Sequence, residues 1–254
     1  MPEKLVADPE GLGNIFANSV ALGVGQFCTS PGLLIGVKSL ALDKFIETLS
    51  QAFAGKDAVT MLNKKIATSY YTHRGVLIEQ TGVDTLGDTN NPGENKGKPL
   101  TAKVDGKTFL SNPKLHEEIF GPFTLVVACE DAAEMLAVAN ALDGQLTGTL
   151  VATEGDIQAH PEIVEALSTK VGRILFNGVP TGVEVCDSMQ HGGPYPASTD
   201  QRTTSVGTAA IGRFVRPIAY QSWPDNLLPD PLKNSNPLGL WRVVNGDLTK
   251  SPIV

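Results

Sequence analysis

The 254-residue sequence lacks several features that mark broad classes of protein. Its 20 lysines and arginines are outnumbered by 27 aspartates and glutamates, and the net charge of −7 argues against nucleic-acid and anionic-membrane partners. No apolar run approaches the roughly 18 residues that a membrane-spanning helix needs. The N-terminus has neither the basic nor the apolar region of an export signal, so we expect a cytoplasmic protein.

Cysteine is scarce as well. Cys28, Cys129 and Cys186 make an odd number and form no CxxC pair, which excludes a disulfide framework and a cysteine-based metal site. The four histidines show no HxxxH or HExxH spacing, and we expect no bound metal. A glycine-rich phosphate loop of the GxGxxG or Walker type is missing too, so this chain carries no such cofactor fingerprint.

What is present predicts an α/β fold. Strands are expected at residues 33–37, 123–129, 146–152 and 172–177, and helices at 9–22, from 39 onward, and at 58–74, 132–142 and 161–170. The third of these helices should be interrupted at Gly75-Val76. Strands that alternate with helices of this length indicate a mostly parallel sheet covered by helices on both faces.

Three shorter segments complete the pattern. Residues 82–98 are polar and rich in glycine and asparagine, which predicts a surface loop. Residues 101–110 predict two short strands around an Asp105-Gly106 turn. From residue 214 the prolines at 217, 224, 229, 231 and 237 and both tryptophans make the chain too proline-rich for regular elements and too apolar to be free. We therefore expect one domain over residues 1–213 and a proline-rich tail over 214–254 that packs on a domain or subunit surface.

Cys28 is the most informative residue for chemistry. It lies in a loop bounded by Gly25 and Gly32, after a predicted helix and before a predicted buried strand. A thiolate there could attack an electrophilic carbon, and a neighbouring backbone amide could stabilise the oxyanion that forms. A packed, inert cysteine is the alternative. Cys129 and Cys186 are expected to be structural.

His191 defines a second hypothesis. Its loop, Gln190-His191-Gly192-Gly193-Pro194, is flexible enough to approach a ligand. A Cys28–His191 dyad would give a cysteine-dependent esterase or acyl-transfer enzyme, but no spacing in the sequence ties the two residues together. A catalytically silent interaction domain is the third hypothesis, and selective thiol labelling would distinguish it from the other two.

Three motifs together resemble the aldehyde dehydrogenase superfamily. Gly25-Gln26-Phe27-Cys28 resembles the active-site cysteine motif of the family, and Glu117-Glu118-Ile119-Phe120-Gly121-Pro122 resembles its second strong motif, with a typical spacing. Residues 173–178 follow in the expected order. Residues 26–32 and 191–199 resemble the 2-oxoglutarate semialdehyde (2,5-dioxovalerate) dehydrogenases, with the NADP-dependent fatty aldehyde dehydrogenases as the nearest alternative.

The resemblance implies the catalytic-domain fold of that family and a set of residue roles. Cys28 would attack the aldehyde to form a thiohemiacetal, and the thioester that follows oxidation would be hydrolysed by water. Glu118 and Phe120 would contact the NADP or NAD cofactor. Phe27, Thr29, Asn177 and His191 would line the substrate side.

The chain also departs from the family pattern. Family members are about twice as long, and the nucleotide-binding domain, the oxyanion asparagine and the general-base glutamate find no counterpart here. This predicts a truncated reading frame or one chain of a split pair, with a separate nucleotide-binding chain as partner. Because one general base contributes about 10²–10⁴-fold, we expect the isolated chain to be weakly active or inactive. We also expect a homo-oligomer, since a missing domain leaves apolar surface uncovered.

Overall fold

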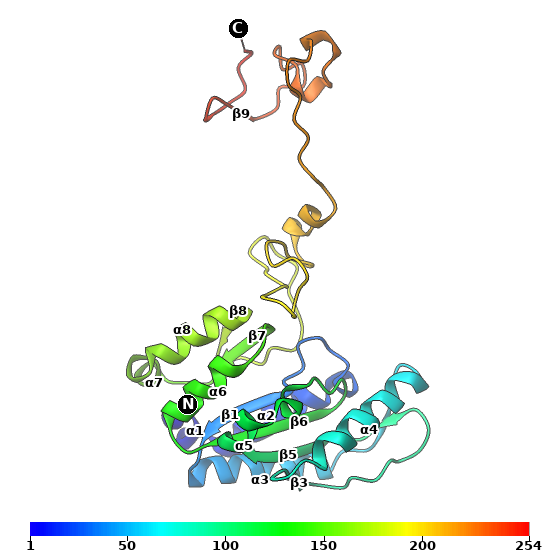
Figure 1. Ribbon diagram of the computed structural model, residues 1–254, viewed down its shortest axis with the longest axis vertical. Coiled ribbons are helices and arrows are strands. Elements are labelled where there is room, and N and C mark those ends of the chain that lie inside the picture. The colour runs from blue at the N-terminus through cyan, green and yellow to red at the C-terminus, as the bar shows by residue number, and fades with distance from the viewer. Residues whose placement is uncertain (254) are drawn as a thin grey trace. The chain divides into compact units, whose positions relative to one another are not determined.

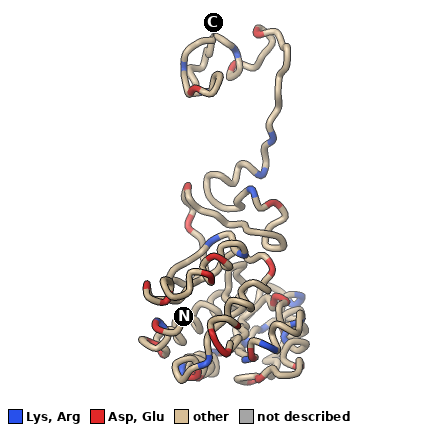
Figure 2. The backbone as a smooth tube through the Cα atoms, turned by 60° about the vertical axis from the view of Figure 1, so that its left-hand side comes forward, with Lys and Arg blue, Asp and Glu red and all other residues tan. Residues whose placement is uncertain are grey.

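The computed structural model describes residues 1–253, and the chain divides into two compact units, Met1–Arg213 and Phe214–Val254. The first unit holds the buried core and the elements shown in the lower part of Figure 1. Acidic and basic residues are interspersed over this unit (Figure 2), as the modest net charge suggests.

A four-stranded sheet with the order β1-β6-β5-β3 forms the centre of the first unit. The strands β1 (Leu33–Val37), β6 (Phe123–Cys129) and β5 (Leu100–Asp105) are parallel, and β3 (Asp84–Leu86) is an antiparallel edge strand. All seven residues of β6 are buried, as a central strand covered on both faces requires. The predicted α/β class with a mostly parallel sheet is confirmed.

Two helices cover one face of this sheet. α2 (Pro9–Ala21) and α3 (Leu40–Ala54) pack against each other and against Val126 and Ala128 of β6. Both begin at capping side chains, because Asp8 accepts a hydrogen bond from the Gly11 N–H (2.8 Å) and Ser39 accepts one from the Leu42 N–H (3.1 Å). The predicted starts of these helices and the end of α2 before Gly23 are confirmed.

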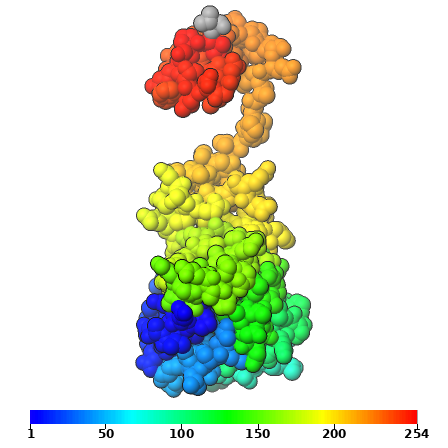
Figure 3. All heavy atoms as spheres, turned by 90° about the vertical axis from the view of Figure 1, so that its left-hand side faces the viewer, coloured from blue at the N-terminus to red at the C-terminus, as the bar shows by residue number. Residues whose placement is uncertain are grey.

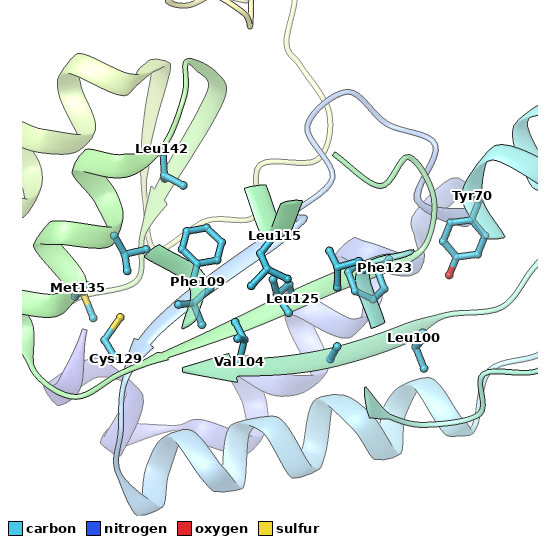
Figure 4. Close-up of a cluster of buried hydrophobic side chains, with 14 of the residues drawn as sticks. Tyr70, Leu100, Val104, Phe109, Leu115, Phe123, Leu125, Cys129, Met135 and Leu142 are labelled. Carbon is cyan, nitrogen blue, oxygen red and sulfur yellow. The ribbon is translucent and has the colours of Figure 1, made fainter. Parts of the chain in front are cut away.

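The opposite face of the sheet carries the larger of two clusters of buried hydrophobic side chains. Figure 4 shows Phe109, Leu115 and Met135 above the sheet, on the side away from α3. Phe109 comes from α5 (Gly106–Ser111), Leu115 from the 3₁₀ turn η2 (Pro113–His116) and Met135 from α6 (Ala132–Ala141). Side chains of β6 alternate between the two clusters, so one strand supports both layers.

A second, two-stranded parallel sheet completes the first unit. It pairs β7 (Gln145–Leu150) with β8 (Val171–Phe176), joined through α7 (Glu154–Ala159) and α8 (Pro161–Lys170). The short helix α1 (Pro2–Ala7) lies beside α7, as the dark-blue and light-green surfaces in Figure 3 show. The Asp156 carboxylate fixes this contact by accepting the N–H groups of Glu3 and Lys4 (both 3.1 Å).

In the middle of the chain, the structure shifts one predicted helix and replaces a predicted turn. The helix expected over 58–74 is α4 (Lys64–Ile78), capped by Asn63. It runs through Gly75, and its last turn contains the buried Leu77, although an interior glycine costs about 1 kcal/mol. Asp105-Gly106 does not form a hairpin turn. Instead Asp105 accepts a hydrogen bond from the Thr108 N–H (2.7 Å) and caps α5.

The loop expected over 82–98 is also partly wrong, because it contains β3 and β4 (Lys96–Gly97), and β4 pairs with β2 (Val59–Thr60).

The second unit is mostly irregular but does contain regular elements. It holds two short 3₁₀ turns, η4 (Asp225–Leu227) and η5 (Asp230–Leu232), and an antiparallel pair of β9 (Arg242–Val244) and β10 (Asp247–Thr249). Its packing on another surface stays a prediction. Among residues 1–253, no helix is long and apolar enough to cross a bilayer.

Candidate active site around Cys28

The loop that carries Cys28 is entered through an unusual backbone turn. After α2, the 3₁₀ turn η1 (Leu22–Gly25) places Gly23, Val24 and Gly25 at φ angles of 56°, 59° and 65°. A β-branched residue rarely adopts this left-handed conformation. Val24 is buried in the core cluster, so its packing holds the turn in place. The chain then leaves the core and exposes Phe27 and Cys28.

Gly25 brings the cysteine loop against the second motif. A Cβ atom on Gly25 would collide with the backbone of Gly121 and Pro122, so these two segments touch through their main chains. The sheet explains the proximity, because β1 and β6 are parallel neighbours and the loops that precede them meet at the same edge. Cys28 and the Glu117–Pro122 turn thus belong to one surface region of the first unit.

Tyr70 of α4 holds this turn from behind. Its ring lies where a Cβ on Gly121 would be, and its hydroxyl lies 2.8 Å from the Lys98 carbonyl and 3.3 Å from the Pro122 carbonyl. Burial raises the pKa of Tyr70 far above its usual value of about 10, so the hydroxyl stays protonated and can donate. Sequence reasoning missed this residue, since a tyrosine within a helix gives no signal of the turn that it supports.

Glu118 and Phe120 are both exposed on that turn, and Phe120 is 37% accessible. Among the other predicted site residues, Thr29 is buried and Phe27 packs over Gly23. An exposed carboxylate and an exposed ring beside the cysteine loop suit the sugar hydroxyls and the flat ring of a nucleotide cofactor. The residues therefore fit the cofactor contact expected from the sequence.

His191 lies beside Cys28. Its Nε2 atom is 3.3 Å from the Cys28 Sγ atom, within hydrogen-bond distance for sulfur, although 163 residues separate the two in sequence. His191 is 8% exposed. This burial, together with the positive charge of Arg173, lowers the pKa of His191 below its usual value of about 6.5. A neutral imidazole therefore faces the thiol near pH 7 and can accept its proton.

Contacts within residues 173–191 and with α2 hold the His191 loop. The Arg173 guanidinium of β8 donates to the carbonyl oxygens of Pro180 and Gly182 (both 3.2 Å). The hydroxyls of Ser19 and Thr181 are 2.6 Å apart and join α2 to the same loop. The helix that leads to Cys28 and the loop that leads to His191 are thereby linked directly.

The side chain of Asn177 makes its hydrogen bonds away from Cys28 and His191. Its side-chain amide accepts the Ala152 N–H (2.9 Å) and donates to the Ala152 carbonyl (2.8 Å) at the carboxyl end of β8. The His191–Gly193 segment packs at the other end of that strand, against Gly172, about 16 Å away at 3.3 Å per residue. The structure thus gives Asn177 a structural contact at a distance from His191, and a role beside the substrate stays a prediction.

The other two cysteines lie in surroundings unlike those of Cys28. Cys129 is fully buried at the end of β6, and burial raises the pKa of its thiol to about 12. Cys186 is half-buried, with its sulfur 3.5 Å from the Ser188 hydroxyl. Within residues 1–253, no group of histidine, cysteine and carboxylate side chains has the arrangement of a metal site.

Comparison with known proteins places these features in a family. A family model described as the aldehyde dehydrogenase family matches residues 6–207. The alpha-ketoglutaric semialdehyde dehydrogenase of Acinetobacter baylyi is 44% identical over 253 residues, which cover 99% of this chain and 48% of that protein. The chain therefore spans about half the length of this curated relative.

Solved structures resemble the fold. The NAD-dependent aldehyde dehydrogenase of Sinorhizobium meliloti has a TM-score of 0.63 and 21% identity, covering 82% of this chain and 41% of that one. The glyceraldehyde-3-phosphate dehydrogenase GapN of Methanocaldococcus jannaschii, complexed with NADP, has a TM-score of 0.60 and 21% identity, covering 73% of this chain and 40% of that one. At these identities the likeness concerns the fold alone.

Proposed function

Because this chain belongs to the aldehyde dehydrogenase family, we propose that it is the catalytic portion of an NAD(P)-dependent enzyme that oxidises an aldehyde to a carboxylate. The observation that carries the proposal is the position of Cys28, exposed beside the Glu117–Pro122 turn and in contact with His191. Fold relatives described as NAD-dependent and as complexed with NADP support either form of the cofactor.

Cys28 acts as the nucleophile in the proposed reaction. Its sulfur bonds to the aldehyde carbon, the carbonyl π bond opens, and the oxygen takes up the negative charge of a thiohemiacetal. His191 accepts the thiol proton at Nε2, because a ring that is neutral near pH 7 carries a free lone pair on this atom. Water later hydrolyses the thioester and frees the sulfur.

Glu118 and Phe120 hold the cofactor in this proposal. The exposed Glu118 carboxylate would accept hydrogen bonds from ribose hydroxyls, and the exposed Phe120 ring would pack beside the nicotinamide. When bound, the cofactor supplies the hydride acceptor. Contact between Gly25 and Gly121 keeps the two residues next to the cysteine loop. Phe27 and Thr29 complete the substrate side from the cysteine loop itself.

We further propose 2-oxoglutarate semialdehyde as the aldehyde, because the relative at 44% identity is an alpha-ketoglutaric semialdehyde dehydrogenase. A fatty aldehyde is the alternative substrate. The 254 residues alone should be weakly active or inactive, and a separate nucleotide-binding chain would restore activity. The cytoplasmic location and homo-oligomeric state expected from the sequence stay predictions.

Complementation tests the main proposal. The purified chain is assayed for aldehyde-dependent NAD(P)H formation alone and after mixing with a separately expressed N-terminal half of the Acinetobacter baylyi relative. We expect little activity alone, clear activity in the mixture, and its loss in Cys28→Ala. Higher kcat/KM for 2-oxoglutarate semialdehyde than for a long-chain aldehyde would support the substrate. Activity that survives Cys28→Ala would contradict the proposal.

The 3.3 Å contact between Cys28 and His191 favours a second activity, cofactor-independent acyl transfer. A thiol next to a neutral base can attack an activated ester without a hydride acceptor. We expect the chain alone to hydrolyse p-nitrophenyl acetate, and both Cys28→Ala and His191→Gln to abolish the reaction. Cys186→Ser is the matched control and should retain it. An unreactive Cys28 in both assays would instead support a catalytically silent domain.

A further inference from the structure

Hydrogen bonds with a later segment of the chain fix the main chain of His191. The side chain of Thr204, thirteen residues later and only 3% exposed, accepts the His191 N–H at 2.8 Å. The same Oγ1 atom donates to the Val206 carbonyl at 2.8 Å, and its hydrogen is thereby committed. One buried oxygen therefore fixes the His191 N–H to the segment that follows.

Ser205 fixes the other polar group of the His191 main chain. Its N–H and its hydroxyl both donate to the His191 carbonyl oxygen, at 2.9 Å and 2.8 Å. Together, Thr204 and Ser205 bind both the main-chain donor and the main-chain acceptor of His191. Two adjacent residues thus determine where the backbone of the histidine lies.

The imidazole ring itself has no comparable support. Within residues 1–253, the buried Nδ1 atom has no hydrogen-bond partner. In most nucleophile–base pairs a third group orients the base through its second ring nitrogen. Among residues 1–253, the Nε2 contact with Cys28 is the one hydrogen bond of the ring, so its orientation depends on packing and on where the backbone places the Cα–Cβ bond.

We propose that Thr204 is the positioning residue that sets the distance between the His191 imidazole and the Cys28 thiol, acting through the backbone of His191. This inference rests on the proposed roles of Cys28 as nucleophile and His191 as base. Loss of the Thr204 hydroxyl leaves the His191 N–H without its acceptor and lets the residue shift. Since a misplacement of about 1 Å can cost up to about a hundred-fold in rate, a small shift is enough to weaken proton transfer.

Cys28 alkylation tests this role without cofactor or aldehyde. Iodoacetamide reacts with the sulfur, iodide leaves, and the thiol proton passes to His191 or, at high pH, to hydroxide. Peptide mass spectrometry follows Cys28 in the full chain from about pH 6 to about pH 10, for the wild type and for Thr204→Val, Thr204→Ser, Thr203→Val and His191→Gln. The Thr203 hydroxyl donates to the Asp200 carbonyl (3.2 Å), whereas the His191 N–H is accepted by Thr204, which makes Thr203→Val a matched control.

We expect Thr204→Val to slow alkylation of Cys28 about three- to thirty-fold near pH 7. His191→Gln should slow the same reaction, and the rates of all variants should converge near pH 10. Thr204→Ser and Thr203→Val should follow the wild type. Alkylation of Cys186 and the melting temperature report whether the fold is intact. If Thr204→Val does not fold, Ser205→Ala, which removes one of two donors to the His191 carbonyl, should slow alkylation in the same direction but less.

Two results would overturn the inference and leave the proposed function standing. One is a Thr204→Val profile that superimposes on the wild type while His191→Gln is slow. The other is equal slowing in Thr204→Val and Thr204→Ser, which would assign the effect to packing and not to the hydroxyl. If His191→Gln itself alkylates like the wild type, the base role of His191 fails, and the positioning role of Thr204 fails with it.

Discussion

The uncharged state of His191 links the site to folding stability. Burial and the charge of Arg173 lower the pKa of His191 in the folded chain, whereas the unfolded chain retains a value of about 6.5. Above that value both states are neutral at this residue. As the pH falls through about 6.5, the unfolded state binds a proton that the folded state resists, so acid favours unfolding.

This gives a prediction for pH dependence. Lowering the pH from about 7.5 to about 5.5 should reduce the free energy of unfolding of the wild type more than that of His191→Gln, since 6.5 lies within this range. Urea denaturation at each pH measures the free energy of unfolding. His73→Gln changes an exposed histidine on α4 outside the site and serves as the control substitution. Equal slopes for the wild type and His191→Gln would contradict the prediction.

At the scale of elements, one of the two glycines that bound the cysteine loop determines where the loop lies. Gly25 has a φ angle of 65° and touches the Gly121 backbone. A Cβ atom on Gly32, at the other end of the loop, would meet no atom within 4 Å apart from its chain neighbours. Only the first position therefore requires the absence of a side chain.

We expect Gly25→Ala to lower the free energy of unfolding by at least about 1–3 kcal/mol, because it adds a strained φ angle and a backbone collision. It should also change the alkylation rate of Cys28, since the loop must move away from Gly121. Gly32→Ala is the matched control, with a much smaller effect on both quantities. Chemical denaturation and thiol labelling measure them, and equal stability of the two variants would exclude this role for Gly25.

Elements that depend on local signals could be predicted from the sequence. The helix caps at Asp8, Ser39 and Asp131 and the apolar run of β6 are each encoded within a few residues, and all appear in the structure. Asp105-Gly106 shows the limit of this approach. The same dipeptide suits a hairpin turn and a helix start, and burial of Phe109 three residues later selects the helix.

The site was only partly predictable for the same reason. The motifs indicated Cys28, Glu118 and Phe120, because their neighbours in sequence carry the family pattern. Contact between Cys28 and His191 spans 163 residues and depends on how the β8 region packs beside α2, for which no local pattern exists. Thr204 lies in an irregular segment, and its role is visible only from its hydrogen bonds.

At the scale of the whole molecule, the first unit contains every residue of the two hydrophobic clusters. A fragment that ends at Arg213 should therefore fold cooperatively and retain the pH profile of Cys28 alkylation. Circular dichroism during heating and peptide mass spectrometry measure these properties, with the full chain as reference. A fragment that is unfolded, or in which Cys28 no longer depends on His191, would show that residues 214–254 are needed for the core.

Three successive left-handed residues before Cys28 also bear on how the chain reaches its native state. A left-handed valine costs roughly 1–2 kcal/mol, and Val24 adopts this conformation while buried in the core cluster. Without the packing of Val24 in the cluster, nothing offsets this cost, and the turn should be sparsely populated in the unfolded chain. We therefore expect the contact between Cys28 and His191 to form only after the cluster around Val24, and pulsed thiol labelling of Cys28 during refolding would measure this order.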